Sequence, residues 1–88
     1  MKMPEVIDGL LIALIEKIDI EEDPNSAGDQ IIAIRRFLQE ELGSDDGSKP
    51  AFEITVATIK KEGVIFEKDY KMCADQVAHI YNGLAKEY

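Results

Sequence analysis

The chain has 88 residues, of which 45% are hydrophobic, and a formal net charge of −8. This length predicts a single domain, residues 1–88, and the hydrophobic content excludes a disordered acidic tail. Because the longest apolar run, residues 10–15, is too short to cross a bilayer and Cys73 is the single cysteine, we expect a cytoplasmic protein without an internal disulfide.

The first predicted element is a helix over residues 4–19. Pro4 suits its first turn, where the missing N–H of proline is no loss. Apolar residues recur at helical spacing and form one wide face, made of Val6, Ile7, Leu10, Leu11, Leu14, Ile15 and Ile18. Ile12 and Ala13 widen this face beyond what one neighbouring helix covers. We therefore expect this helix to lie at the centre of a bundle or in a homodimer interface.

The opposite side of this helix carries a line of acids with one isoleucine in it. Steps of three and four residues connect Glu5, Asp8, Ile12, Glu16 and Asp19. One interpretation is a solvated face with a single exposed apolar residue, which needs no special explanation. The other is a docking surface for a basic partner.

An acidic segment follows before Pro24, which ends the first helix. Its four acids are Asp19, Glu21, Glu22 and Asp23. Carboxylates at a helix C-terminus oppose the helix dipole, so such a cluster indicates another role, such as contact with a partner's cations. A solvated loop is the alternative interpretation.

A second helix is predicted over residues 26–42, with Ser26 or Asn25 as its cap. Its inward stripe consists of Ile31, Ile34, Leu38 and Leu42, flanked by Ala27 and Phe37. Ile32 lies on the polar side, a second apolar residue out of the pattern. Gly43 is expected to end the helix in the left-handed conformation, and residues 43–50 are predicted to be a flexible linker with nothing to bury.

Residues 51–70 allow two interpretations. As a helix over 50–62, the segment opens at Pro50 and buries a stripe of Phe52, Val56 and Ile59. As a hairpin, the alternation over residues 52–58 and its Ile, Thr and Val residues favour a strand. We favour the helix because the hairpin registers that we compared give no clean apolar face.

A last helix is predicted over residues 68–87. Its stripe is Cys73, Val77, Ile80, Tyr81, Leu84 and Tyr88. Gly83 interrupts it at a cost of about 1 kcal/mol relative to alanine, which a close helix contact would explain. The sequence therefore predicts an all-α four-helix bundle with helices near 4–19, 26–42, 50–62 and 68–87. The alternative is an α+β fold in which a β-hairpin at 52–70 replaces the third helix.

The chemical groups of a typical enzyme are sparse in this sequence. Cys73 and His79, the single cysteine and histidine, are six residues apart and fall on different sides of a helix. The apolar stripe predicts that Cys73 is a core residue. Asp45 and Asp46 lack the ligand pattern of a calcium loop. We therefore predict a non-catalytic protein with no cofactor and no metal.

The excess negative charge lies in the first half of the chain. Residues 1–48 hold 12 acids and 4 bases, whereas residues 49–88 hold 6 of each. This distribution argues against nucleic-acid and membrane binding and favours encounter with a basic protein. The predicted function is a protein-binding module, such as an inhibitor or a mimic of DNA. The predicted contact residues are Ile12, Glu16, Asp19, Glu21, Glu22 and Asp23.

In size and charge the chain resembles bacterial toxin-immunity proteins and phage-encoded inhibitors. The colicin-type immunity proteins carry a Tyr-Tyr-Pro segment that Phe52-Glu53-Ile54 does not match, so no residue role is carried over. The alternative function is a structural or assembly subunit, of a phage or another complex, that self-associates through its first helix.

Overall fold

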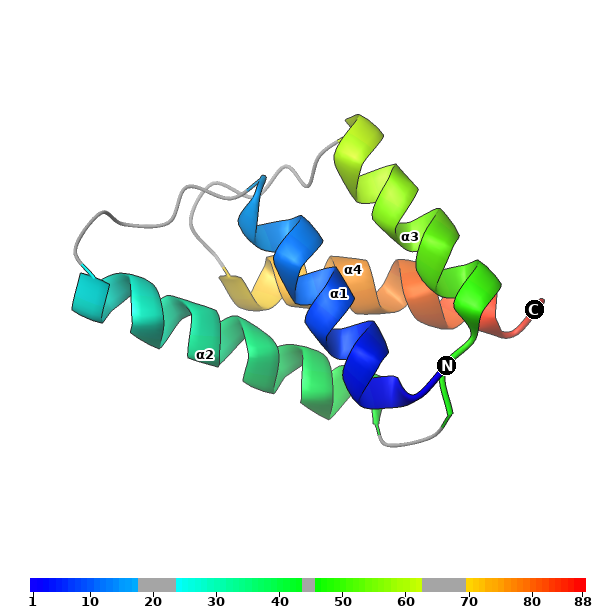
Figure 1. The fold of residues 1–88 in the computed structure, drawn as a ribbon, viewed down its shortest axis with the longest axis horizontal. Helices are drawn as coiled ribbons and strands as arrows, with labels where there is room; N and C mark the ends of the chain where they lie inside the picture. Colours follow the sequence, from blue (N-terminus) through cyan, green and yellow to red (C-terminus); the bar gives the residue numbers. More distant parts are fainter. Residues whose placement is uncertain (18–23, 44–45, 63–69) are drawn as a thin grey trace.

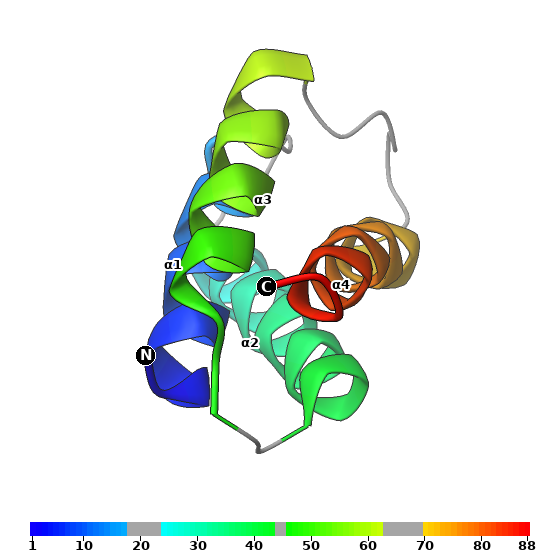
Figure 2. The same cartoon turned by 90° about the vertical axis from the view of Figure 1, so that its right-hand side faces the viewer.

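A computed structural model describes residues 1–17, 24–43, 46–62 and 70–88. These residues form four helices, α1 (Met3–Ile15), α2 (Pro24–Leu42), α3 (Lys49–Glu62) and α4 (Tyr70–Ala85), and no strand. Helices α1 and α3 lie side by side and cross α2 and α4 (Figures 1 and 2). The all-α prediction is confirmed. The hairpin alternative is wrong because residues 49–62 are helical.

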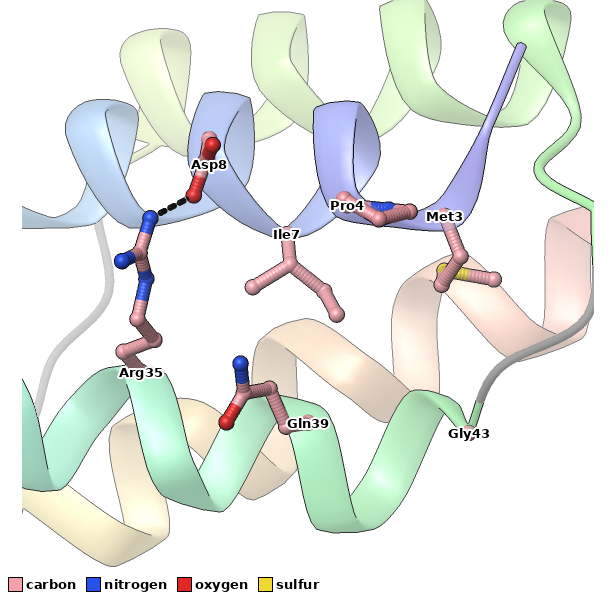
Figure 3. Close-up of a pocket in the computed structure, with 7 residues that line it drawn as sticks. All are labelled: Met3, Pro4, Ile7, Asp8, Arg35, Gln39 and Gly43. Atoms are coloured by element: carbon pink, nitrogen blue, oxygen red, sulfur yellow. Dashed lines mark hydrogen bonds and ion pairs between the residues drawn. The ribbon is translucent and has the colours of Figure 1, made fainter.

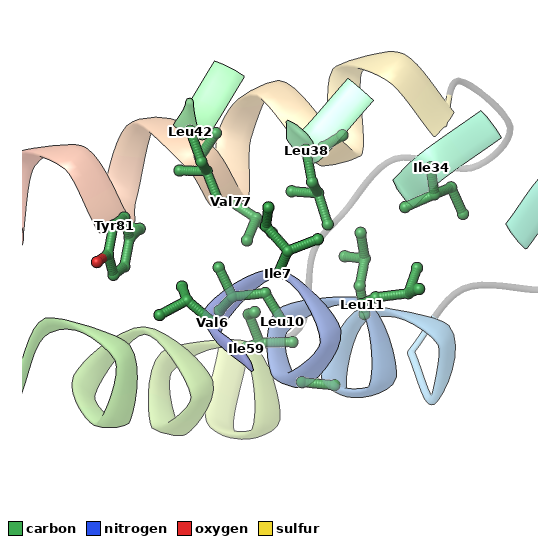
Figure 4. Close-up of a cluster of buried hydrophobic side chains, with 14 of the residues drawn as sticks. Val6, Ile7, Leu10, Leu11, Ile34, Leu38, Leu42, Ile59, Val77 and Tyr81 are labelled. Carbon is green, nitrogen blue, oxygen red and sulfur yellow. The ribbon is translucent and has the colours of Figure 1, made fainter. Parts of the chain in front are cut away.

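The hydrophobic core lies where the two pairs of helices meet (Figure 4). The helix α1 supplies the largest share of it, with Met3, Val6, Ile7, Leu10, Leu11, Ala13 and Leu14 buried. Packing against both α2 and α3 covers the described part of this wide face within one chain, whereas Ile18 lies outside the described residues. The homodimer stays a prediction, and among the described residues of α1 Ile12 is the large apolar side chain that remains exposed.

The helix boundaries differ from the predicted ones by a few residues. The helix α1 ends at Ile15 rather than near residue 19, and the Lys17 N–H donates to the Leu14 carbonyl at 3.0 Å, a short-range bond that tightens the end. The helix α2 begins with Pro24 in its first turn, so Ser26 lies inside the helix rather than at its cap. The helix α4 ends at Ala85, and Tyr88 beyond it is exposed.

The buried face of α3 is rotated from the predicted stripe. Ala51, Thr55 and Ile59 are fully or almost fully buried, whereas Phe52 and Val56 pack at the edge of the core. Burial of Thr55 is tolerated because its hydroxyl donates to the Ala51 carbonyl at 2.7 Å. Phe52 lies so close to α1 that a Cβ on Gly9 would overlap its ring.

The predicted linker before α3 is held in place at its second half. Ser48 caps α3, because its Oγ accepts a hydrogen bond from the Ala51 N–H at 3.3 Å. The Ser48 N–H donates to the Tyr81 hydroxyl at 2.8 Å, and the Gly47 N–H donates to the Met1 carbonyl at 2.6 Å. The prediction that this segment has nothing to bury is therefore wrong for Gly47 and Ser48, which are half-buried. Gly43 has the expected positive φ of 74°.

Gly83→Ala should raise the free energy of unfolding by about 1 kcal/mol, the difference in helix propensity between the two residues. A Cβ at this exposed position in α4 would meet nothing within 4 Å, so the close helix contact that Gly83 suggested is not formed. Urea denaturation measures the gain. Gly43→Ala is the control and should destabilise, because alanine is strained at positive φ. A loss of stability in Gly83→Ala would contradict the open surroundings of this residue.

Candidate functional site

Two of the six predicted contact residues lie in the described part of the chain. Ile12 is 61% exposed on α1, and Glu16 is exposed directly after the last residue of that helix. They are four residues apart and share the outward side of α1. The other four, Asp19, Glu21, Glu22 and Asp23, lie outside the described residues.

The acidic line on α1 is partly neutralised. Asp8 forms an ion pair with Arg35 of α2 (Figure 3). The exposed Glu5 and Glu16 form no ion pair with any residue that the structure describes, and α1 itself contains no basic residue. Two carboxylates therefore remain on the outward side of α1, one on either side of Ile12 along the helix.

The Asp8–Arg35 pair joins residues 27 positions apart in the chain. Their side chains are 51% and 48% exposed, so the pair contributes about 0–1 kcal/mol to stability. The pair lies where the outer edges of α1 and α2 approach each other. No local sequence pattern connects Asp8 with Arg35, so the pair becomes apparent when the two helices are packed.

A hollow of about 610 Å³ lies between α1 and α2, on the N-terminal side of Asp8 (Figure 3). It is lined by Met3, Pro4, Ile7, Asp8, Arg35, Gln39 and Gly43. Met3 and Ile7 are each 5% exposed and form an apolar floor, while Asp8, Arg35 and Gln39 supply a polar rim. A hollow with an apolar floor and a polar rim is suited to bind an apolar side chain of another molecule that has a polar group beside it.

Ile32 extends this surface beyond the ion pair. It is 58% exposed and lies three residues before Arg35 on α2. Met3 and Pro4 lie toward Gly43 at the end of α2, whereas Asp8 pairs with Arg35 further back along α2, so the two helices run roughly antiparallel (Figure 3). Ile12 and Ile32 therefore both lie past the Asp8–Arg35 pair, away from the hollow. We call the hollow, the ion pair, Ile12 and Ile32 together the α1–α2 face.

The sequence itself carries a signal for part of this face. Ile12 and Ile32 both fell on the polar side of their helices, yet Ile12 alone entered the predicted site. The hollow gave no such signal, because its floor residues Met3 and Ile7 belong to α1 and its rim residue Gln39 to α2. Its existence depends on how the two helices cross.

The single cysteine and the single histidine differ in exposure. Cys73 is fully buried in the core, as predicted, whereas His79 is exposed on α4. Within residues 1–17, 24–43, 46–62 and 70–88, no three His, Cys, Asp or Glu side chains are grouped so that they could hold a metal ion.

No protein-family model, curated protein or solved structure matches this chain. Across the described helices, none combines the length and the apolar character needed to cross a lipid bilayer. The functional inference therefore depends on the exposed residues and on the charge of the chain.

Proposed function

We propose that this protein is a non-catalytic module of the cytoplasm that binds a basic protein partner through its acidic first half. The observation that carries the proposal is Ile12, an apolar side chain 61% exposed on the outward side of α1 that also bears Glu5 and Glu16. The proposed contact residues are Ile12, Glu16, Asp19, Glu21, Glu22 and Asp23.

Charge and apolar contact have separate roles in this proposal. The net charge of residues 1–48, 12 acids against 4 bases, attracts a basic surface from a distance and speeds encounter. Salt screens that attraction, because the Debye length falls from roughly 14 Å to about 4 Å between 0.05 and 0.5 M salt. Ile12 then supplies an apolar contact from which water is excluded.

Reversal of the acidic segment should abolish binding to the basic partner. We expect the wild-type protein to capture that partner from its native host at low salt and to lose it at high salt. The triple variant Glu21→Lys, Glu22→Lys, Asp23→Lys should capture none, because the reversed charges repel a basic surface. Pull-down at both salt concentrations measures capture, and far-UV circular dichroism verifies that the variant remains helical.

A charge-matched variant controls for the change in net charge. Glu53→Lys, Glu67→Lys and Glu87→Lys make the same alteration in the second half of the chain and should leave capture largely intact. If the first triple variant still binds, the acidic segment is a solvated loop and the proposed contact residues are wrong. Salt-resistant self-assembly of the wild-type protein would instead support a structural or assembly subunit.

A further inference from the structure

We propose that the α1–α2 face receives one amphipathic, basic helix of the partner. This inference rests on the proposed function and adds the form of the bound segment and the residues that anchor it. The face offers apolar groups at two places along α1 and α2. One is the hollow, which is floored by Met3 and Ile7, and the other, past the Asp8–Arg35 pair, is formed by the exposed Ile12 and Ile32.

The spacing of these groups suits a helix. Ile7, which floors the hollow, and Ile12 are five residues apart on α1, which corresponds to about 7.5 Å along the helix axis. A helix that lies in a groove uses apolar anchors at positions i, i+4 and i+7, which extend over about 10 Å. One anchor can therefore enter the hollow while another reaches Ile12 and Ile32 on the same face.

The charges along the face favour basic flanks on the bound helix. Glu5 and Glu16 are exposed and form no ion pair with a described residue, and α1 itself contains no base. Arg36 is an exposed base on α2, four residues after Ile32, so the basic residues of the bound helix are expected on its α1 side. Arg35 is engaged by Asp8, which offsets its charge. Lysine or arginine residues beside the apolar stripe of the partner helix would thus meet carboxylates near both ends of the face.

The outer side of α3 lacks this complementarity. It exposes Ile54 at 39%, but Lys60 and Lys61 occupy the last turn of the same helix. A basic helix would meet like charges there, which disfavours binding. The α1–α2 face is therefore the better match among these two apolar surfaces, and Ile54 offers a matched control residue.

A synthetic 18-residue helix with leucines on one side and lysines on the other is the probe. Added to the ¹⁵N-labelled protein, it should shift the amide resonances of Ile12, Ile32 and Arg35 and leave those of Ile54 unchanged. Ile32→Ser should weaken its affinity roughly tenfold, the loss typical of an anchoring apolar contact, whereas Ile54→Ser should leave it unaltered. Both isoleucines are exposed, so neither change should disturb folding.

Several results would overturn this inference. Equal binding of a peptide with serine in place of leucine would show that charge alone is recognised. Shifts confined to α3 and α4, no binding, or equal affinity of Ile32→Ser would exclude the α1–α2 face. If Ile32→Ser lowers the sedimentation mass of the free protein, a second copy occupies the face instead. The pull-down with the acidic-segment variant tests the proposed function separately, since a salt-labile partner can persist when the α1–α2 face is excluded.

Discussion

Leu10→Ala is expected to lower the free energy of unfolding by roughly 2–5 kcal/mol, the range for a buried leucine truncated to alanine. Leu10 is fully buried in α1 and belongs to the cluster where the two pairs of helices meet (Figure 4). Truncation to alanine would leave an apolar cavity in the core. Because domains of this kind are stable by about 5–15 kcal/mol, the loss is a large part of the total.

Urea denaturation followed by far-UV circular dichroism measures this loss as a lower midpoint at an unchanged slope. Ile12→Ala is the matched control in the same helix, because Ile12 is 61% exposed and its truncation should change stability by less than about 0.5 kcal/mol. Equal losses in the two variants would contradict the packing of α1 against α2 and α3.

Periodicity predicted three of the four helices because each has a long stripe of large apolar residues. The third was ambiguous, because Ile54, Thr55 and Val56 favour a strand in isolation. In the fold this segment is a helix that buries Thr55. The burial is possible because the Thr55 hydroxyl forms a hydrogen bond within α3. A pattern that counts threonine as polar places the stripe on Phe52 and Val56 instead, and this explains why the predicted face was rotated.

The candidate site was less predictable than the fold. The exposure of Ile12 and Ile32 follows from their position on the polar side of each helix, so the sequence identifies both. The Asp8–Arg35 pair and the hollow depend on the crossing of α1 and α2, which no local pattern encodes. Residues 19–23 are a similar case. Their composition identifies them as an acidic segment, but a composition does not specify which surface the segment contacts.

Gly47 also shows how composition can mislead. Glycine, serine and aspartate in residues 43–50 are typical of a flexible linker. In the fold, however, Gly47 lies against the start of α1, with its N–H bonded to the Met1 carbonyl at 2.6 Å. A Cβ at this position would overlap Val6 Cγ2 and lie 3.1 Å from the Met1 carbonyl oxygen. Absence of a side chain, rather than backbone freedom, is what this position requires.

Gly47→Ala is therefore expected to destabilise the fold by about 1–3 kcal/mol, the usual cost of overpacking a filled site. Val6 is fully buried, so moving its side chain away from the added methyl group would disturb its own packing. Thermal or urea unfolding measures the loss, and Gly28→Ala is the matched control, since its Cβ would meet nothing within 4 Å.

A double variant tests the cause of this loss. Val6→Ala destabilises by itself, but it removes the atom that the new methyl group would overlap. The combined change Gly47→Ala, Val6→Ala should consequently cost less than the sum of the two single changes, with a coupling of about 0.5–3 kcal/mol. Strictly additive losses would mean that Gly47 is needed for a reason other than its close approach to Val6.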